Sequence, residues 1–173
     1  LVNQGLIPGI EEAGERYDRK QYFLPQLMMA AETMKKAFTI VKPLLSQQAG
    51  QSQGTIIMAT VEGDIHDIGK NIVCVLLENY GFRVIDLGKD VKPEVIIDTA
   101  AREGADIIGL SALMTTTMPA MKKVIEQARA RDLNCKIMVG GAVLTPDYAD
   151  SIGADAYSED ARAAVLAARK LLN

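Results

Sequence analysis

Residues 55–77 read TIIMATVEGDIHDIGKNIVCVLL, and this stretch decides the fold class. The apolar run over 55–61 predicts a buried strand, and the apolar residues after the turn predict a helix. The only histidine of the chain, His66, therefore falls on a strand-to-helix turn, where open α/β sheets place their ligand contacts. Asp64 is near enough in the sequence to orient the imidazole, and Gly69 would let a ligand approach the backbone. The pattern predicts a histidine that is positioned to bind a ligand.

Strands and helices alternate from here to the end of the chain. Short apolar segments predict strands at Thr55–Val61, Arg83–Leu87, Ile107–Ser111, Ile137–Val139 and Ala156–Tyr157. Amphipathic segments predict helices at Ile68–Tyr80, Pro93–Glu103, Met118–Arg131, Thr145–Ile152 and Ala161–Leu172. We therefore expect an α/β fold, a doubly wound five-stranded parallel sheet of the Rossmann or flavodoxin type, with helices on both faces and the ligand over the carboxyl ends of the strands.

The N-terminal part of the chain carries no strand signal. Apolar residues recur at helical spacing over 6–17 and again over 24–41. Pro25 fits the first turn of the second helix, and Pro43 is expected to end that helix. Two helices alone make a poor bundle, so we expect either that they pack on the second domain or that further helices precede Leu1.

The polar, small residues of 46–54 have no period and predict a linker. The expected organisation is a helical segment over 1–45, the linker over 46–54, and the Rossmann-like domain over 55–173.

The composition excludes several classes of protein. The chain has 173 residues, 49% of them apolar, a net charge of −3 and a pI near 5.2. This charge argues against a nucleic-acid surface, and no apolar run reaches the ~20 residues that span a bilayer. Cys74 and Cys135 form no zinc or redox motif and are expected to be buried thiols of a reducing compartment. We expect a cytoplasmic protein with no nucleic-acid and no membrane partner.

The carboxyl ends of the predicted strands carry the residues of one expected site. The first strand is followed by Asp64, His66 and Gly69, the third by the hydroxyl-rich run 111–117, and the fourth by Gly140 and Gly141. Parallel strands end at the same edge of a sheet, so these residues should lie close together. The site would offer one imidazole, a neighbouring carboxylate, several hydroxyls and two stretches of bare backbone.

Common site chemistries do not match this set. A P-loop is excluded because five residues separate Gly63 from Gly69 and Asn71 stands where Ser or Thr would bind magnesium. No G-x-G-x-x-G follows a predicted strand, the ligands are too few for zinc, and a serine elbow is absent. The remaining chemistry is a single imidazole that serves as axial ligand to a metal already held by a macrocycle, with Asp64 as its acceptor. The alternative is a structural His66 that caps the helix or bonds the backbone.

Three motifs together resemble the cobalamin-binding signature. They are Asp64-x-His66-x-x-Gly69, then Ser111 with Thr115, and then Gly140-Gly141. The resemblance implies that cobalamin or a related corrinoid is bound base-off and His-on. In that arrangement the signature histidine replaces the cofactor's own dimethylbenzimidazole as the lower axial ligand of cobalt.

The resemblance gives each matched residue a role. His66 would be the metal ligand, Asp64 would hydrogen-bond His66, and the Thr117 hydroxyl would extend this relay. Ser111 and Thr115 would contact the displaced base in a slot through the sheet. The other implied cofactor-binding residues are Asp67, Gly69, Leu113, Gly140 and Gly141. The last two would line the slot, where a side chain would clash.

The N-terminal segment adds to the resemblance. Residues 17–27, YDRKQYFLPQL, are similar to the helical cap of methyl-carrying members, namely methionine synthase and the corrinoid proteins of methyltransferase systems. In that family apolar side chains cover the upper face of the corrin, and the matching residues are Tyr17, Phe23, Leu24 and Leu27. The resemblance implies that residues 1–45 form a partial helical cap, with only about half of the family's four-helix unit present, so we expect the chain to begin inside that module.

The implied function is that of a methyl carrier in one-carbon metabolism. A substrate-specific methyltransferase would pass a methyl group to cob(I)alamin on this chain. An acceptor methyltransferase would take it from methylcobalamin and give it to a folate or a thiol. A reductive activator would be a third partner. The chain itself would be a non-catalytic corrinoid subunit, with the linker as the hinge of its cap.

Other functions share parts of these motifs. The chain is alternatively the cobalamin-binding module of methionine synthase, or a B12-dependent sensor or regulator with a DNA-binding domain ahead of Leu1. An adenosylcobalamin mutase subunit would share the histidine signature but lack the cap. A plain flavodoxin-like binding domain with a structural His66 is the last alternative. The sequence leaves the methyl donor and the oligomeric state open.

Overall fold

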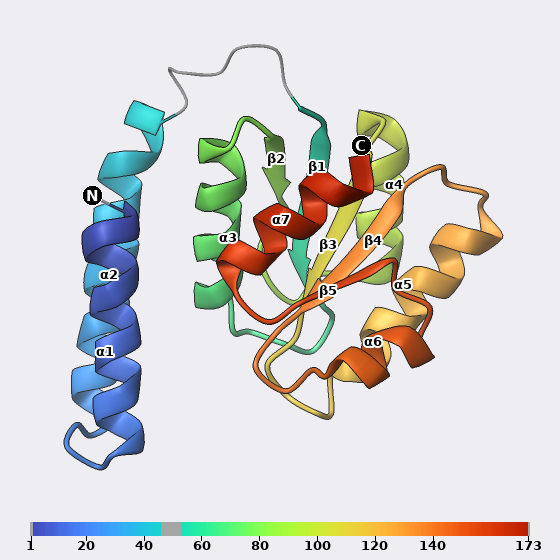
Figure 1. Ribbon diagram of the computed structural model, residues 1–173. Helices are drawn as coiled ribbons and strands as arrows, with labels where there is room; N and C mark the ends of the chain where they lie inside the picture. The colour runs from blue at the N-terminus through green and yellow to red at the C-terminus, as the bar shows by residue number, and fades with distance from the viewer. Residues whose placement is uncertain (1, 46–52, 173) are drawn as a thin grey trace. The chain divides into compact units, whose positions relative to one another are not determined.

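The computed structural model describes residues 2–45 and 53–172 of the chain. The chain divides into two compact units, Leu1–Gln48 and Ala49–Asn173. The first unit is helical and the second is an α/β domain (Figure 1). Most of the predicted linker, residues 46–52, lies outside the described part of the chain.

The N-terminal unit is a helical hairpin. A π-helical turn, Val2–Leu6, leads into α1, Ile7–Asp18, which packs against α2, Leu24–Leu45 (Figure 1). Pro25 lies in the first turn of α2, as predicted. The prediction that Pro43 ends the helix is wrong, because α2 continues for two more residues. A proline in the last turn removes one intrahelical hydrogen bond and leaves the preceding turns intact.

The second unit is built on a parallel sheet. Its five strands are β1 (Thr55–Thr60), β2 (Arg83–Asp86), β3 (Ile107–Ser111), β4 (Lys136–Gly140) and β5 (Ala156–Ser158). They lie in the order β2-β1-β3-β4-β5, and every neighbouring pair is parallel. This is the flavodoxin-like order of doubly wound folds, so the predicted fold class is confirmed.

Helices cover both faces of this sheet (Figure 1). They are α3 (Ile68–Asn79), α4 (Pro93–Glu103), α5 (Met118–Ala130), α6 (Pro146–Ser151) and α7 (Ala161–Leu172). α3 packs with α7, and α4 packs with α5. Each predicted strand and helix of this unit agrees with the observed one to within one residue at either end. In the described ranges, no helix combines the length and the apolar character that a membrane crossing needs.

Burial explains why the strands are so apolar. From Ile56 onward every residue of β1 is buried, as expected for a strand covered on both faces. Ile57 and Ile108 share one core cluster with Ile96 of α4 and Met121 of α5. The sheet is therefore the rigid support of whatever lies at its carboxyl edge.

The strand order reverses at β1, and this reversal defines the place for a ligand. The chain leaves β1 toward β2 on one side, and β3 lies on the other side. The connections that leave β1 and β3 therefore separate and open a crevice beyond their carboxyl ends. Thr60 pairs with Ser111, so the loop 61–67 begins beside the loop 112–117.

Candidate functional site

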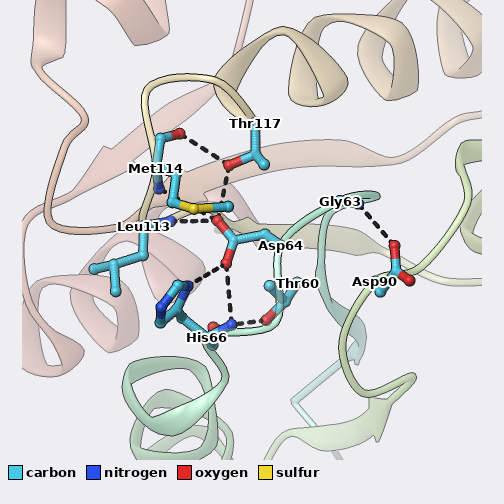
Figure 2. Close-up of polar contacts among 8 residues, drawn as sticks. All are labelled: Thr60, Gly63, Asp64, His66, Asp90, Leu113, Met114 and Thr117. Carbon is cyan, nitrogen blue, oxygen red and sulfur yellow. Dashed lines mark hydrogen bonds and ion pairs between the residues drawn. The ribbon is translucent and has the colours of Figure 1, made fainter.

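Asp64 is the buried centre of the site (Figure 2). Its Oδ1 accepts hydrogen bonds from the backbone N–H of His66 at 3.0 Å and from the His66 ring nitrogen Nδ1 at 2.8 Å. Its Oδ2 accepts the Thr117 hydroxyl at 2.8 Å and the backbone N–H groups of Leu113 and Met114 at 2.8 and 3.3 Å. One carboxylate thus ties the loop after β1 to the loop after β3.

The local sequence explains how the loop after β1 forms. An aspartate that accepts a hydrogen bond from the backbone two residues later makes an Asx turn, which reverses the chain directly after the strand. Gly63 has a φ of +83°, a conformation in which glycine is favoured. The Thr60 hydroxyl donates to the carbonyl oxygen of His66 at 3.3 Å. The turn is therefore closed by its own side chains.

Asp64 is ionised in this environment. Burial alone raises its pKa, but the hydrogen bonds from His66, Leu113 and Thr117 outweigh burial and hold the pKa of Asp64 well below its usual range. An ionised carboxylate only accepts hydrogen bonds. The proton in the contact with the imidazole therefore belongs to Nδ1 of His66.

His66 is thereby prepared as a donor to a metal. With the proton fixed on Nδ1, the neutral ring carries its lone pair on Nε2. The side chain is 45% exposed, whereas that of Asp64 is fully buried. Figure 2 shows the ring with its Nδ1 edge turned toward Asp64, while its other ring nitrogen makes no drawn contact. An oriented imidazole with an accessible lone pair is the arrangement found in metal-ligating histidines.

Exposed apolar side chains lie on the same two loops and at the start of α3. Ile65 is 62% exposed, Ile68 is 42% exposed and Leu113 is 39% exposed. Of these, the sequence pointed only to Leu113, although Ile65 and Ile68 stand inside the signature itself. Three exposed apolar side chains on the segments that carry and adjoin the imidazole suit a ligand with a broad apolar face.

The glycines predicted to belong to the site differ in what surrounds them. A Cβ added to Gly69, in the first turn of α3, would meet nothing within 4 Å. The fold itself therefore does not require this glycine. A Cβ at Gly140 would lie 2.9 Å from the Ser158 carbonyl oxygen, and one at Gly141 would lie 1.9 Å from the Ala112 carbonyl oxygen. These two glycines permit a close approach of the protein's own backbone.

The remaining residues predicted for this edge lie along the same two loops. Ser111 ends β3 and is half-buried, and Thr115 is exposed in the loop that follows. Asp67 occupies the position before α3, and its side chain makes no capping hydrogen bond. Thr117 is buried, and its hydroxyl lies 2.8 Å from both Asp64 Oδ2 and the Met114 carbonyl oxygen. Its single proton is shared between these two acceptors.

Sequence reasoning missed an ion pair between a buried lysine and a more exposed aspartate. The Lys70 side chain is fully buried, and its Nζ donates to Asp86 Oδ1 at 2.5 Å and to Asn71 Oδ1 at 2.8 Å. Asp86 Oδ1 also accepts the backbone N–H of Gly88 at 2.8 Å. The pair fastens the first turn of α3 to the end of β2. A lysine in the first turn of an otherwise apolar helix was the available signal.

The residues predicted for the cap lie in the other unit. Tyr17 is 40% exposed and Phe23 is 68% exposed. The backbone N–H of Phe23 donates to Gln26 Oε1 at 3.0 Å, which supports the turn before α2. The side chains of Leu24 and Leu27 lie outside the described residues.

The donor set decides what kind of metal group the site suits. Within 2–45 and 53–172, no three His, Cys, Asp or Glu residues gather into a group that could hold a metal ion alone. The site presents one nitrogen donor with apolar surroundings. It therefore suits a metal whose other ligands come from a macrocycle with apolar faces, and a corrinoid is such a group.

Comparison with known proteins agrees with this geometry. Residues 54–166 match a family model described as a B12 binding domain, and residues 1–42 match a second model with the same description. The chain therefore belongs to the B12-binding family. Within that family it belongs with the corrinoid proteins of methyltransferase systems, because proteins of this kind match nearly the whole chain.

The similar proteins cover nearly the whole chain. A dimethylamine corrinoid protein of Methanosarcina acetivorans is 45% identical, over 99% of this chain and 82% of that protein. The solved monomethylamine corrinoid protein of Methanosarcina barkeri has a TM-score of 0.82 at 34% identity, and the match covers 98% of this chain and 82% of that one. A chain of the methanol:cobalamin methyltransferase complex MtaBC of Methanosarcina barkeri gives a TM-score of 0.69 at 32% identity. This match covers 99% of this chain and 66% of that one. The predicted family and its corrinoid cofactor are thereby confirmed.

Proposed function

We propose that this chain is a methyl carrier that binds its corrinoid base-off and His-on, with Nε2 of His66 as the lower axial ligand of cobalt. The observation that carries the proposal is the fixed tautomer of His66. The ionised, buried Asp64 accepts the Nδ1–H of His66 in a 2.8 Å hydrogen bond, and this leaves the lone pair of the ring accessible on Nε2. When bound, the corrinoid supplies a cobalt ion that accepts and releases a methyl group.

The other residues of the edge have supporting roles in this proposal. Asp64 makes the His66 ring a better donor and fixes its orientation, and Thr117 holds Asp64 in place. Leu113, with Ile65 and Ile68, offers apolar contact to the face of the corrin. The proposed neighbours of the displaced base are Ser111, Thr115, Gly140 and Gly141. Asp67, which makes no capping bond, is free for a polar contact with the cofactor rim.

The N-terminal unit is proposed to act as the cap. Residues 1–45 would cover the corrin, 46–54 would serve as the hinge, and 55–173 would hold the cofactor. The exposed aromatic side chains of Tyr17 and Phe23 support this role, because exposed rings suit an apolar partner surface. Leu24 and Leu27 are the other residues that the resemblance assigns to the cap. A cap of this kind keeps water from the reacting methyl group and must move for each transfer.

Two methyltransferases and a reductive activator are the proposed partners, in the cytoplasm. A chain of the methanol:cobalamin methyltransferase complex MtaBC is 32% identical to this chain, and this supports the first partner. A methylated amine is the proposed methyl donor. The relatives named for dimethylamine and trimethylamine are 45% and 40% identical, whereas the methanol complex is 32% identical. The acceptor would be a folate or a thiol.

Methyl transfer with purified partners tests the function. The cobalamin-loaded protein is mixed with reductant, a thiol, a thiol methyltransferase, and methyltransferases specific for monomethylamine, dimethylamine, trimethylamine or methanol. We expect methyl thioether to form from one methylated amine, only when carrier and both enzymes are present. A loaded protein that supports no transfer from any of the four donors would contradict the carrier role.

His66→Ala is expected to remove the axial nitrogen while leaving the fold intact. Because the ring is nearly half exposed, its loss should change the free energy of unfolding by less than about 1 kcal/mol. Cobalamin bound to the variant should lack the nitrogen ligand, and free imidazole in the buffer should restore it. Absorbance spectra with and without imidazole check this result. Identical spectra of wild type and variant would show that His66 does not reach the cobalt.

Gly69→Ala separates stability from cofactor binding. Alanine is favoured over glycine in a helix by ~1 kcal/mol, and nothing within 4 Å obstructs its methyl group. The variant should therefore be as stable as the wild type or more stable. If the space beside Gly69 is kept for the corrinoid, cobalamin binding should nevertheless weaken by about tenfold or more. Urea unfolding and cobalamin titration measure the two effects, and unchanged affinity would assign Gly69 no role in binding.

A further inference from the structure

A short loop from the neighbouring strand braces the histidine loop. It spans 87–92, between β2 and α4, and contacts the two residues that open the histidine turn. Asp90 Oδ1 accepts the backbone N–H of Gly63 at 2.7 Å (Figure 2). The backbone N–H of Asp90 donates to the carbonyl oxygen of Asp64 at 2.9 Å. Asp90 therefore binds Gly63 through its side chain and Asp64 through its backbone.

The same loop continues strand pairing beyond the end of β1. The backbone N–H of Thr60 donates to the Gly88 carbonyl oxygen at 2.9 Å, and Val91 N–H donates to the Thr60 carbonyl oxygen at 3.1 Å. Val61 and Val91 form an isolated parallel bridge. The backbone from Thr60 to Asp64 is thus held along one side by a single short segment.

The backbone of Asp90 has an unusual conformation. Its φ is +53°, in the left-handed region that most L-residues avoid. Glycine would adopt this conformation without cost, but it would supply no carboxylate for Gly63. Aspartate is among the few other residues that tolerate the conformation. An aspartate here therefore serves both the turn and the bond to the histidine loop.

We propose that Asp90 is a positioning residue, which holds Asp64 and His66 in the ligating arrangement before the corrinoid binds. Asp90 does not touch the imidazole and acts on it through the backbone of Gly63 and Asp64. A segment that is already ordered need not lose its freedom on binding, so affinity is gained without a new contact with the ligand. The inference rests on the proposed role of His66 as the cobalt ligand.

Three variants separate this role from ordinary turn stability. Asp90→Gly keeps the left-handed backbone and removes the carboxylate. Asp90→Asn keeps an acceptor oxygen and a residue that tolerates the conformation, so it should restore the wild-type behaviour. Asp132→Gly is the matched control, because Asp132 has a φ of +49° in the turn between α5 and β4.

The first readout needs no cofactor. His66 is the only histidine, so the ring nitrogen signals of ¹⁵N-labelled, corrinoid-free protein report on one imidazole. At a pH where the ring is neutral, wild type, Asp90→Asn and Asp132→Gly should show the Nδ1–H tautomer. Asp90→Gly should move the two nitrogen shifts toward the values of a ring that exchanges between tautomers. The second readout is titration with cobalamin, where Asp90→Gly should bind about tenfold more weakly, as a competent population of about one tenth requires.

The outcomes are distinct. Asp90→Gly with wild-type ring shifts and wild-type affinity would overturn the inference. Asp132→Gly with the same ring and affinity changes as Asp90→Gly would also overturn it, since the effect would then be general stability. A wild-type protein that binds cobalamin without a histidine ligand would refute the proposed function, while the ring shifts would still decide whether Asp90 positions His66.

Discussion

Asp64→Ala is expected to lower the free energy of unfolding by about 3 kcal/mol, because several hydrogen-bond donors lose the one buried acceptor that they share. The Asp64 carboxylate accepts the backbone N–H groups of His66, Leu113 and Met114, the Thr117 hydroxyl and the His66 ring. Water that reaches the freed donors of the two loops should limit the loss of stability. The variant should also lose the fixed tautomer of His66 and the histidine ligation of cobalt.

Two further variants test whether the loss of stability comes from the hydrogen bonds that the Asp64 carboxylate accepts. Asp64→Asn keeps the shape but turns an amide N–H₂ toward donors, so it should lose most of the same stability. Asp67→Asn is the matched control three residues away, because that side chain makes no capping bond and should change stability by less than about 0.5 kcal/mol. Urea unfolding followed by circular dichroism measures all three. Equal stability of Asp64→Ala and Asp67→Asn would show that Asp64 does not hold the two loops together.

Gly141→Ala is expected to have the largest effect on stability, about 4 kcal/mol, from overpacking together with backbone strain. A Cβ at this position would lie 1.9 Å from the Ala112 carbonyl oxygen and 2.9 Å from the Ala112 carbonyl carbon. Both contacts are with backbone at the end of β3, which cannot turn aside as a side chain can. The φ of +137° adds strain for any residue with a Cβ.

Gly88→Ala isolates the conformational part of that cost. Gly88 has a φ of +86°, but a Cβ there would meet nothing within 4 Å. This variant should lose only about 1 kcal/mol. Urea unfolding of both variants gives the comparison. A loss in Gly141→Ala no larger than in Gly88→Ala would mean that the ends of β3 and β4 separate easily.

The fold was predictable because the periodicity is unambiguous. Each strand of the second unit is a short apolar run, and each helix is amphipathic between turn residues, so local pattern and global fold agree. The position of His66 followed from the same pattern, since the turn after the first strand lies at the carboxyl edge. The predicted end of α2 at Pro43 was wrong because a proline in the sequence does not distinguish the last turn of a helix from its end.

The partners of the histidine loop were much less accessible to sequence reasoning. Leu113 and Met114 bind Asp64 through backbone N–H groups, which any residue type carries, across 49 and 50 positions of chain. Asp90 reaches Gly63 across 27 positions, and no spacing rule connects an exposed aspartate to that turn. The sequence predicts a ligating histidine from its neighbours, whereas the bonds that hold it become visible only in the folded chain.

The most direct test of the central claim is EPR of the cobalt(II) form of the bound corrinoid, in protein labelled uniformly with ¹⁵N and loaded with unlabelled cobalamin. If Nε2 of His66 is the axial ligand, labelling should change each superhyperfine triplet into a doublet, because the coupled nitrogen comes from the protein. His66→Ala should lose this splitting. Triplets that persist in the labelled wild-type protein would show that the cofactor's own base is the ligand, and they would contradict base-off, His-on binding.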